Sequence, residues 1–275
     1  MRDLLLGVAS AAAVSVLVIG AARADPPAAA PAGDNAITPQ GVAGIDYSYV
    51  GLNQGLGNAN VYGGELGGIV PFSQDFSGQV TGGYHRIASD DIGANDWNVA
   101  GTVSWDPHWG RLGVNVGYTD AGLLGASASV TNYGVYGEMY GDQYTLGARG
   151  GGATLSANAL GVSGSETGGY GGGEAIGYLA PDFAVRGTVG YVGFSGGNQW
   201  TAGVHGEYLF SETVPISGWV GYDYASLGGG GIGETVQGNV FSIGLKYYLG
   251  GTGSLLHRQR TGEDDWGPAA LDLTH

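Results

Sequence analysis

The feature that most constrains this chain is a series of long segments, between residues 41 and 250, in which large apolar residues stand at every second position. Gly or polar residues stand between them, as in 97–105 and 241–249. Successive side chains of a β-strand point to opposite faces, so each segment has one apolar face and one small or polar face. After residue 40 no stretch has the pattern of an amphipathic helix. The sequence therefore predicts an all-β fold.

The length of these segments indicates where they lie. Most span 10–13 residues, whereas a typical globular strand has about 5–6 and a tilted membrane-spanning strand needs about 9–11. The lengths favour strands that cross a membrane. The twelve predicted segments are 42–52, 60–70, 76–88, 97–106, 110–119, 132–141, 143–155, 168–179, 182–194, 199–210, 215–226 and 235–249.

The connections between segments alternate in length. One set is short: 71–75, 106–109, 141–142, 180–182 and 211–215. The other is looser and rich in Gly, Ser and acids: 53–59, 89–96, 120–131, 156–167, 195–198 and 227–234. Short turns at one rim and longer loops at the other are typical of transmembrane barrels. We expect an antiparallel up-and-down β-barrel of about 12 strands over 41–250, with both termini on the periplasmic, short-turn side.

Composition narrows the alternatives. Charged residues make up 12% of the chain, and Lys246 is the one lysine, which is little charge for a water-exposed surface. The 29 aromatic residues argue against disorder, and many stand near segment ends, where rings meet lipid headgroups. A soluble β-sandwich would also accommodate these rings, but it explains neither the long segments nor the single lysine. The absence of Cys excludes disulfides and thiolate metal sites.

The two ends of the chain differ from the barrel segment. Residues 1–24 have the layout of a secretory signal peptide, with Arg2 before an apolar run and cleavage expected between Ala24 and Asp25. The rival interpretation is a retained membrane anchor. The Pro- and Ala-rich stretch 25–40 is expected to be a linker. The tail 251–275 could form a periplasmic plug or contact a partner, but we expect a disordered extension.

Over residues 41–250 the chain resembles the porin-like β-barrels of the Gram-negative outer membrane. The segment 241–249 is the most specific part of the likeness, because in that family the final strand alternates apolar residues and ends with an aromatic. Tyr247, Tyr248 and Leu249 stand at that place, although 26 residues follow. The resemblance implies insertion into the outer membrane by the barrel-assembly machinery and specifies no substrate.

If the large apolar residues face lipid, the opposite face of each strand supplies the lumen. A charged side chain facing lipid costs about 2–4 kcal/mol for Arg or Lys at the midplane. These charges either line a narrow aqueous pore or pair across a closed lumen, and the many small inward residues favour the pore. Glu174 and Arg86 are compatible with either face. The predicted pore-lining residues are Asp46, Glu65, Arg111, Glu138, Arg149, Arg186, His205, Glu207, Asp223 and Lys246.

Several sequence motifs resemble catalytic, phosphate-binding or metal-binding motifs, but we interpret them as structural. Ser195 lies in a G-x-S-x-G pattern, but that motif needs a strand-to-helix turn, and the Gly-rich stretch 228–233 has no helix after it to bind a phosphate. None of the five His is followed two places later by Ser, as the lipid-modifying barrels would require. Three carboxylates at Asp90, Asp91 and Asp96 could hold a divalent cation, although a solvated loop is the expectation. We therefore expect no enzyme, no cofactor and no metal site.

The sequence thus predicts an outer-membrane channel for passive diffusion of small hydrophilic solutes or ions. The alternatives are a non-conducting structural or surface-interaction barrel and an outer-membrane lipid hydrolase. Outer-membrane lipid and lipopolysaccharide are the expected partners. Nucleic acid is not, because the net charge of −15 opposes phosphate binding. The choice between monomer and homo-oligomer stays open.

Overall fold

The computed structural model describes residues 39–53, 57–73, 75–89, 93–123, 126–159, 162–211, 213–229, 235–250 and 253–261. The predicted signal peptide, its cleavage site and nearly all of the linker lie outside these residues. Within the described part the chain forms twelve strands and one short helix. These are β1 (Gln40–Leu52), β2 (Asn58–Pro71), β3 (Phe76–Ala88), β4 (Gly93–Trp105), β5 (Gly110–Leu123), β6 (Ala126–Tyr140), β7 (Tyr144–Ala159), β8 (Val162–Ala180), β9 (Phe183–Phe194), β10 (Gly197–Leu209), β11 (Ile216–Gly228), β12 (Val236–Leu249) and α2 (Leu255–Thr261).

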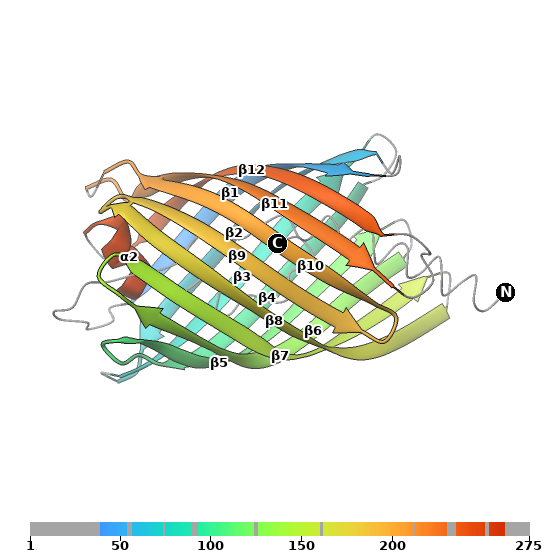
Figure 1. Ribbon diagram of the computed structural model, residues 1–275, viewed down its shortest axis with the longest axis horizontal. Helices are drawn as coiled ribbons and strands as arrows, with labels where there is room; N and C mark the ends of the chain where they lie inside the picture. The colour runs from blue at the N-terminus through green and yellow to red at the C-terminus, as the bar shows by residue number, and fades with distance from the viewer. Residues whose placement is uncertain are drawn as a thin grey trace.

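The strands form one closed antiparallel barrel (Figure 1). Each strand pairs with the next along the chain, and β12 pairs with β1 from Gly41↔Leu249 to Leu52↔Gly238. This confirms the predicted fold class and strand number, and it excludes the sandwich. We call the end with the connections β2–β3, β4–β5, β6–β7, β8–β9 and β10–β11 the turn end. The opposite end is the loop end.

The outer surface of the barrel is apolar at mid-height. Ile45, Leu66 and Val80 are 61–64% exposed, and the same alternation continues around the wall. A belt of exposed aliphatic side chains of this extent is unfavourable in water but favourable against acyl chains. No helix among the described residues is long and apolar enough to cross a membrane.

Aromatic side chains bound this belt on both sides. Trp97 and Trp105 on β4 are eight residues apart, which is ~27 Å along an extended strand and ~20 Å across the membrane at a tilt of ~40°. The two rows match the headgroup-level girdles of membrane barrels. Exposed members of the loop-end girdle are Tyr47, Tyr49, Tyr62, Tyr84, Trp97, Tyr133, Tyr191 and Trp200; those of the turn-end girdle are Phe72, Phe76, Trp105, Trp109, Tyr144, Tyr208, Phe210 and Tyr247.

Two of the predicted long loops are strands instead. The segment 120–131 belongs to β5 and β6, and 156–167 belongs to β7 and β8, with two residues between the strands of each pair. Their register aligns Thr131 with Thr154 and Thr154 with Thr167. The prediction failed because it limited strands to the thickness of the membrane. Strands rich in small hydroxyl residues also pair beyond the loop-end edge of the membrane, and the described residues of both segments continue the barrel wall.

Beyond the loop-end girdle the alternation is reversed, so that apolar side chains point inward and polar side chains point outward. Val50, Val61 and Ile87 point inward and pack as one buried cluster, while outward positions nearby carry Asn60 and Asn95, which accept hydrogen bonds from girdle tyrosines. Polar groups belong on the outside there, because water replaces lipid above the girdle. The reversal therefore marks the upper edge of the apolar belt.

Glycine lets neighbouring strands approach closely. On the inner face of β7, a Cβ on Gly151 would run into the backbone of β6 at Tyr133 and Gly134. A backbone contact cannot move aside as the tip of a side chain can, so this position requires Gly. The 58 glycines of the chain thus serve packing as well as turns.

We expect Gly151→Ala to destabilise the barrel by about 1–3 kcal/mol, because the added methyl forces β6 and β7 apart. The matched control is Gly177→Ala on β8, where a Cβ would meet nothing within 4 Å. Chemical unfolding in detergent micelles measures both variants. Equal stabilities would show that the close approach is not required.

We expect Ile243→Arg to destabilise the inserted barrel by about 2–4 kcal/mol, because it places a charge at mid-belt. Gln237→Arg is the control. It lies on the same face of β12, but beyond the girdle, where the cost should be about 0–1 kcal/mol. Reversible unfolding in lipid vesicles gives both values. The lipid-facing assignment fails if the two substitutions cost the same.

Candidate functional site

The inner wall of the barrel carries its polar chemistry. Burial and strand alternation place all ten predicted pore-lining side chains on the inner faces of their strands. Glu174, compatible with either face in the sequence, also points inward, and Arg86 points outward. Asp96, assigned to a loop by the sequence, lies on β4 and is fully buried on the inner face.

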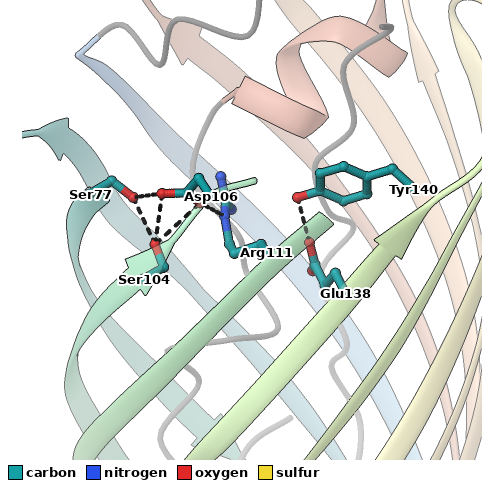
Figure 2. Close-up of polar contacts among 6 residues, drawn as sticks. All are labelled: Ser77, Ser104, Asp106, Arg111, Glu138 and Tyr140. Carbon is teal, nitrogen blue, oxygen red and sulfur yellow. Dashed lines mark hydrogen bonds and ion pairs between the residues drawn. The ribbon is translucent and has the colours of Figure 1, made fainter. Parts of the chain in front are cut away.

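A hydrogen-bonded network occupies the turn end of the wall between β3 and β6 (Figure 2). Arg111 Nε donates to Asp106 Oδ1 at 2.6 Å, and Asp106 Oδ2 accepts from Ser77 at 2.7 Å and from Ser104 at 3.2 Å. On the adjacent strand, Glu138 is the register partner of Arg111. Figure 2 shows Arg111 between the two carboxylates. The guanidinium therefore links the β4–β5 turn to the barrel wall.

Glu138 has a second neighbour that extends this network. It accepts a hydrogen bond from Tyr140 Oη at 2.9 Å. The Arg260 guanidinium of α2 lies over the Tyr140 ring, with its Cζ 5.1 Å from the ring centroid. The wall network is thus continuous with the helix at the turn end.

Three further pairs join neighbouring or nearby strands closer to mid-height. Arg186 Nε donates to Glu174 Oε2 at 2.8 Å. His205 Nε2 lies 3.0 Å from Asp223 Oδ1. The remaining pair is looser, with Lys246 Nζ 3.6 Å from Glu65 Oε1. Charge pairs at hydrogen-bond distance fix side chains against the wall.

His85 lies between two carboxylates in the half of the barrel nearer the loop end. Its Nε2 is 3.7 Å from Asp46 Oδ1, and its Nδ1 is 3.5 Å from Asp96 Oδ2. Asp90 and Asp91, the other members of the acidic cluster considered from sequence, lie outside the described residues. Among the residues that the structure describes, no group of three His, Asp or Glu side chains is arranged to hold a metal ion.

Inner-face glycines form niches that receive these polar side chains. A Cβ on Gly44 would lie 2.8 Å from Glu65 Oε1, and one on Gly147 would lie 2.8 Å from Glu174 Oε1. The carboxylates therefore lie across the neighbouring strand. Glycine on one strand and a long side chain on the next is a pairing that alternation alone does not predict.

The described inner wall is acidic. On the strands, seven buried or half-buried inner carboxylates face four permanent cations, a difference of −3 before the histidines, the exposed Glu166 of β8 and Asp106 of the β4–β5 turn are counted. The acids are Asp46, Glu65, Asp96, Glu138, Glu174, Glu207 and Asp223; the cations are Arg111, Arg149, Arg186 and Lys246. Asp96 and Glu174 account for the excess over the nearly balanced set expected from sequence.

The helix α2 corrects the expectation for the tail, where a disordered extension was preferred to a plug. Leu255–Thr261 was expected to lie in a disordered tail, but it is helical and five of its seven residues are buried at the turn end (Figure 1). Partial burial lowers the pKa of Arg260, and burial together with Arg258 lowers the pKa of His257. The one available signal was the LLHRQRT stretch, which is too short for a recognisable period.

Comparison with known proteins identifies the fold. The translocator domain of autotransporter NalP from Neisseria meningitidis matches with a TM-score of 0.53 at 15% identity, over 78% of this chain and 90% of that one. Weaker likenesses include the KdgM porin, with a TM-score of 0.46 at 11% identity over 74% of this chain and 98% of that one. Another is the CymD monoaromatic hydrocarbon channel, with a TM-score of 0.47 at 9% identity over 78% and 89%. No family profile matches the chain, and no curated protein sequence matches it.

We expect Arg186→Met to destabilise the barrel by about 1–3 kcal/mol, because it removes the 2.8 Å partner of a buried carboxylate. The double variant Arg186→Met/Glu174→Met should recover part of this loss. Arg86→Met, on the outer face, should stay within about 0.5 kcal/mol of the parent. Unfolding in micelles, followed by tryptophan fluorescence, tests the series. A double variant no more stable than the single one would contradict the pairing.

Proposed function

The chain has the fold of an outer-membrane β-barrel, and we propose that it is a channel through which small hydrophilic solutes or ions diffuse passively. One observation carries the proposal: charged and polar side chains line the inner wall while aliphatic side chains cover the outer wall. A barrel that served only as an anchor would not need seven carboxylates and four cations on its inner face. Most of these side chains are buried against the wall, with Arg186 and Lys246 each 1% exposed, so an ion in the lumen passes beside paired charges and is attracted or repelled by their field.

The excess of carboxylates gives the proposed channel a preference. A unit charge about 8 Å from the path of an ion contributes about 0.5 kcal/mol in water, or roughly a factor of two in local ion concentration. The net charge of −3 on the described inner wall therefore favours cations over anions. The preference should weaken at high salt, where screening shortens the range of each charge.

A non-conducting structural barrel is the second candidate, and the ion pairs favour it. Arg186 and Lys246 each lie against a carboxylate from the same wall, and Arg111 lies against Asp106 of the β4–β5 turn. These contacts stabilise the barrel whether or not a solute passes. The two functions differ in one measurable respect, because only a channel conducts.

The proposal includes no enzymatic step. Ser195 lies in the two-residue turn between β9 and β10, whereas a nucleophile elbow leads from a strand into a helix. Outer-membrane lipid and lipopolysaccharide are the proposed partners of the outer surface. On β12, Phe241, Ile243 and Tyr247 point outward, where we propose that the barrel-assembly machinery reads them.

We expect the purified full-length protein to conduct in planar bilayers and to select K⁺ over Cl⁻ in a KCl gradient. Asp46→Asn/Asp223→Asn should reduce that selectivity by a factor of about two to four, since two inner charges are lost. Asp120→Asn is the control, because Asp120 lies on the outward face of β5. The measurement is the reversal potential. Absence of conductance from the full chain, and from variants in which substitution of the buried Leu255 detaches α2 from the turn end, would favour the structural barrel.

A further inference from the structure

The helix α2 lies across the turn-end mouth of the barrel. Its contacts come from opposite sides of the ring of strands: Thr261 Oγ1 accepts from Gln40 Nε2 of β1 at 2.8 Å, while Arg260 Nη2 donates to the carbonyls of Gly141 and Tyr144 beside the β6–β7 turn. In a ring of twelve strands, β1 and β7 face each other. The helix therefore connects two sides of the opening rather than lining one.

An apolar anchor holds the start of α2. Leu255 is fully buried in a cluster with Ile176 and Tyr178 of β8, Leu209 of β10 and Tyr248 of β12. The backbone N–H of Leu256 also donates to the Pro181 carbonyl in the β8–β9 turn at 3.2 Å. A buried leucine with these neighbours is a specific docking contact, because its loss leaves a cavity in the cluster.

A carboxylate of the wall holds the middle of the helix. Gln259 Nε2 donates to Glu207 Oε2 at 3.1 Å. The other oxygen of Glu207 accepts from Ser217 and, at 2.7 Å, from Tyr248 Oη. Gln259 is 1% exposed and Glu207 is also 1% exposed. The contact is thus a neutral amide on a carboxylate that the barrel itself orients.

Two glycines with positive φ lie between the end of β12 and α2. Gly250 has φ +75° and Gly253 has φ +107°, which side chains other than Gly rarely adopt. Arg258 Nε donates to the Gly253 carbonyl at 3.0 Å and fixes the second of these bends. Backbone bends at Gly250 and Gly253 therefore bracket the connection between β12 and α2.

We propose that α2 is a displaceable basic plug: while seated it closes the turn-end mouth, and its departure opens the lumen and makes it more cation-selective. The inference rests on the proposed channel function. Arg258 and Arg260 bring two positive charges to a described wall with a surplus of −3. The seated helix therefore offsets part of that negative charge, and the open lumen regains it.

Unseating the helix in the full-length chain tests the proposal. Leu255→Asp places a charge in the apolar cluster and should raise the open fraction by about tenfold or more, because a buried leucine contributes at least that factor to docking. The reversal potential should also shift toward that of K⁺. His257→Gln is the control, since the His257 ring folds back over Gly253 and its loss should leave the conductance within about twofold of the parent.

The converse test holds α2 in its seated position with a reversible disulfide. The chain has no Cys, so Gln40→Cys/Thr261→Cys introduces the one possible disulfide at a pair whose side chains already touch. Oxidation should suppress conductance, and a reductant should restore it. The single variants Gln40→Cys and Thr261→Cys should respond to neither reagent. If the parent conducts, equal conductance for the parent, Leu255→Asp and the oxidised lock would overturn the plug.

A readout without conduction separates the plug from the channel. Thr145 is fully buried on the inner face of β7, next to the Tyr144 carbonyl that Arg260 holds. We expect a polar thiol reagent to label Thr145→Cys at least about tenfold faster when Leu255→Asp is also present. If no variant conducts but labelling accelerates, the channel fails and the plug stands. If labelling is unchanged, the plug is wrong whatever the conductance.

Discussion

The requirement that every backbone N–H and C=O be paired inside lipid governs this structure. An open sheet would leave two edges unsatisfied in hydrocarbon, so the strands must close, and the pairing of β1 with β12 over their full length does this. Once the ring is closed, each strand has only an outer and an inner face. The period of two along the sequence then assigns every side chain to lipid or to lumen, which is why the apolar belt and the polar wall have to occur together.

Closure also explains why so many residues are glycine. A twelve-stranded wall that carries long polar side chains on its inner face must place them somewhere. Here they lie across neighbouring strands, as Glu65 does over Gly44 and Glu174 over Gly147. The same small residues let backbones approach, as at Gly151. Glycine-richness, which on composition alone suggests low complexity, is in this protein a consequence of packing inside a ring.

How much the sequence predicts depends on whether the signal is periodic. Strand number, closure and the orientation of residues such as Arg186 and Lys246 follow from alternation, because one residue of slip would put a charge in lipid. The sequence did not predict that β5–β8 extend beyond the loop-end girdle. The outer face meets water there instead of lipid, so large apolar residues do not have to alternate with polar ones. The inward cluster of Val50 and Val61 was missed for the same reason. The docking of α2 depends on contacts with strands distant in sequence, which no local pattern encodes.

The charges of the wall are best understood together with α2. If the inner ion pairs served only to neutralise the barrel, cations and carboxylates of the wall would be equal in number, but the described wall has three more carboxylates. One of them, Glu207, accepts hydrogen bonds from Ser217 and Tyr248 of the barrel and from Gln259 of α2. Because Ser217 and Tyr248 belong to the barrel, Glu207 stays oriented when the helix leaves. The same acidic wall therefore attracts the basic helix when the mouth is closed and cations when it is open.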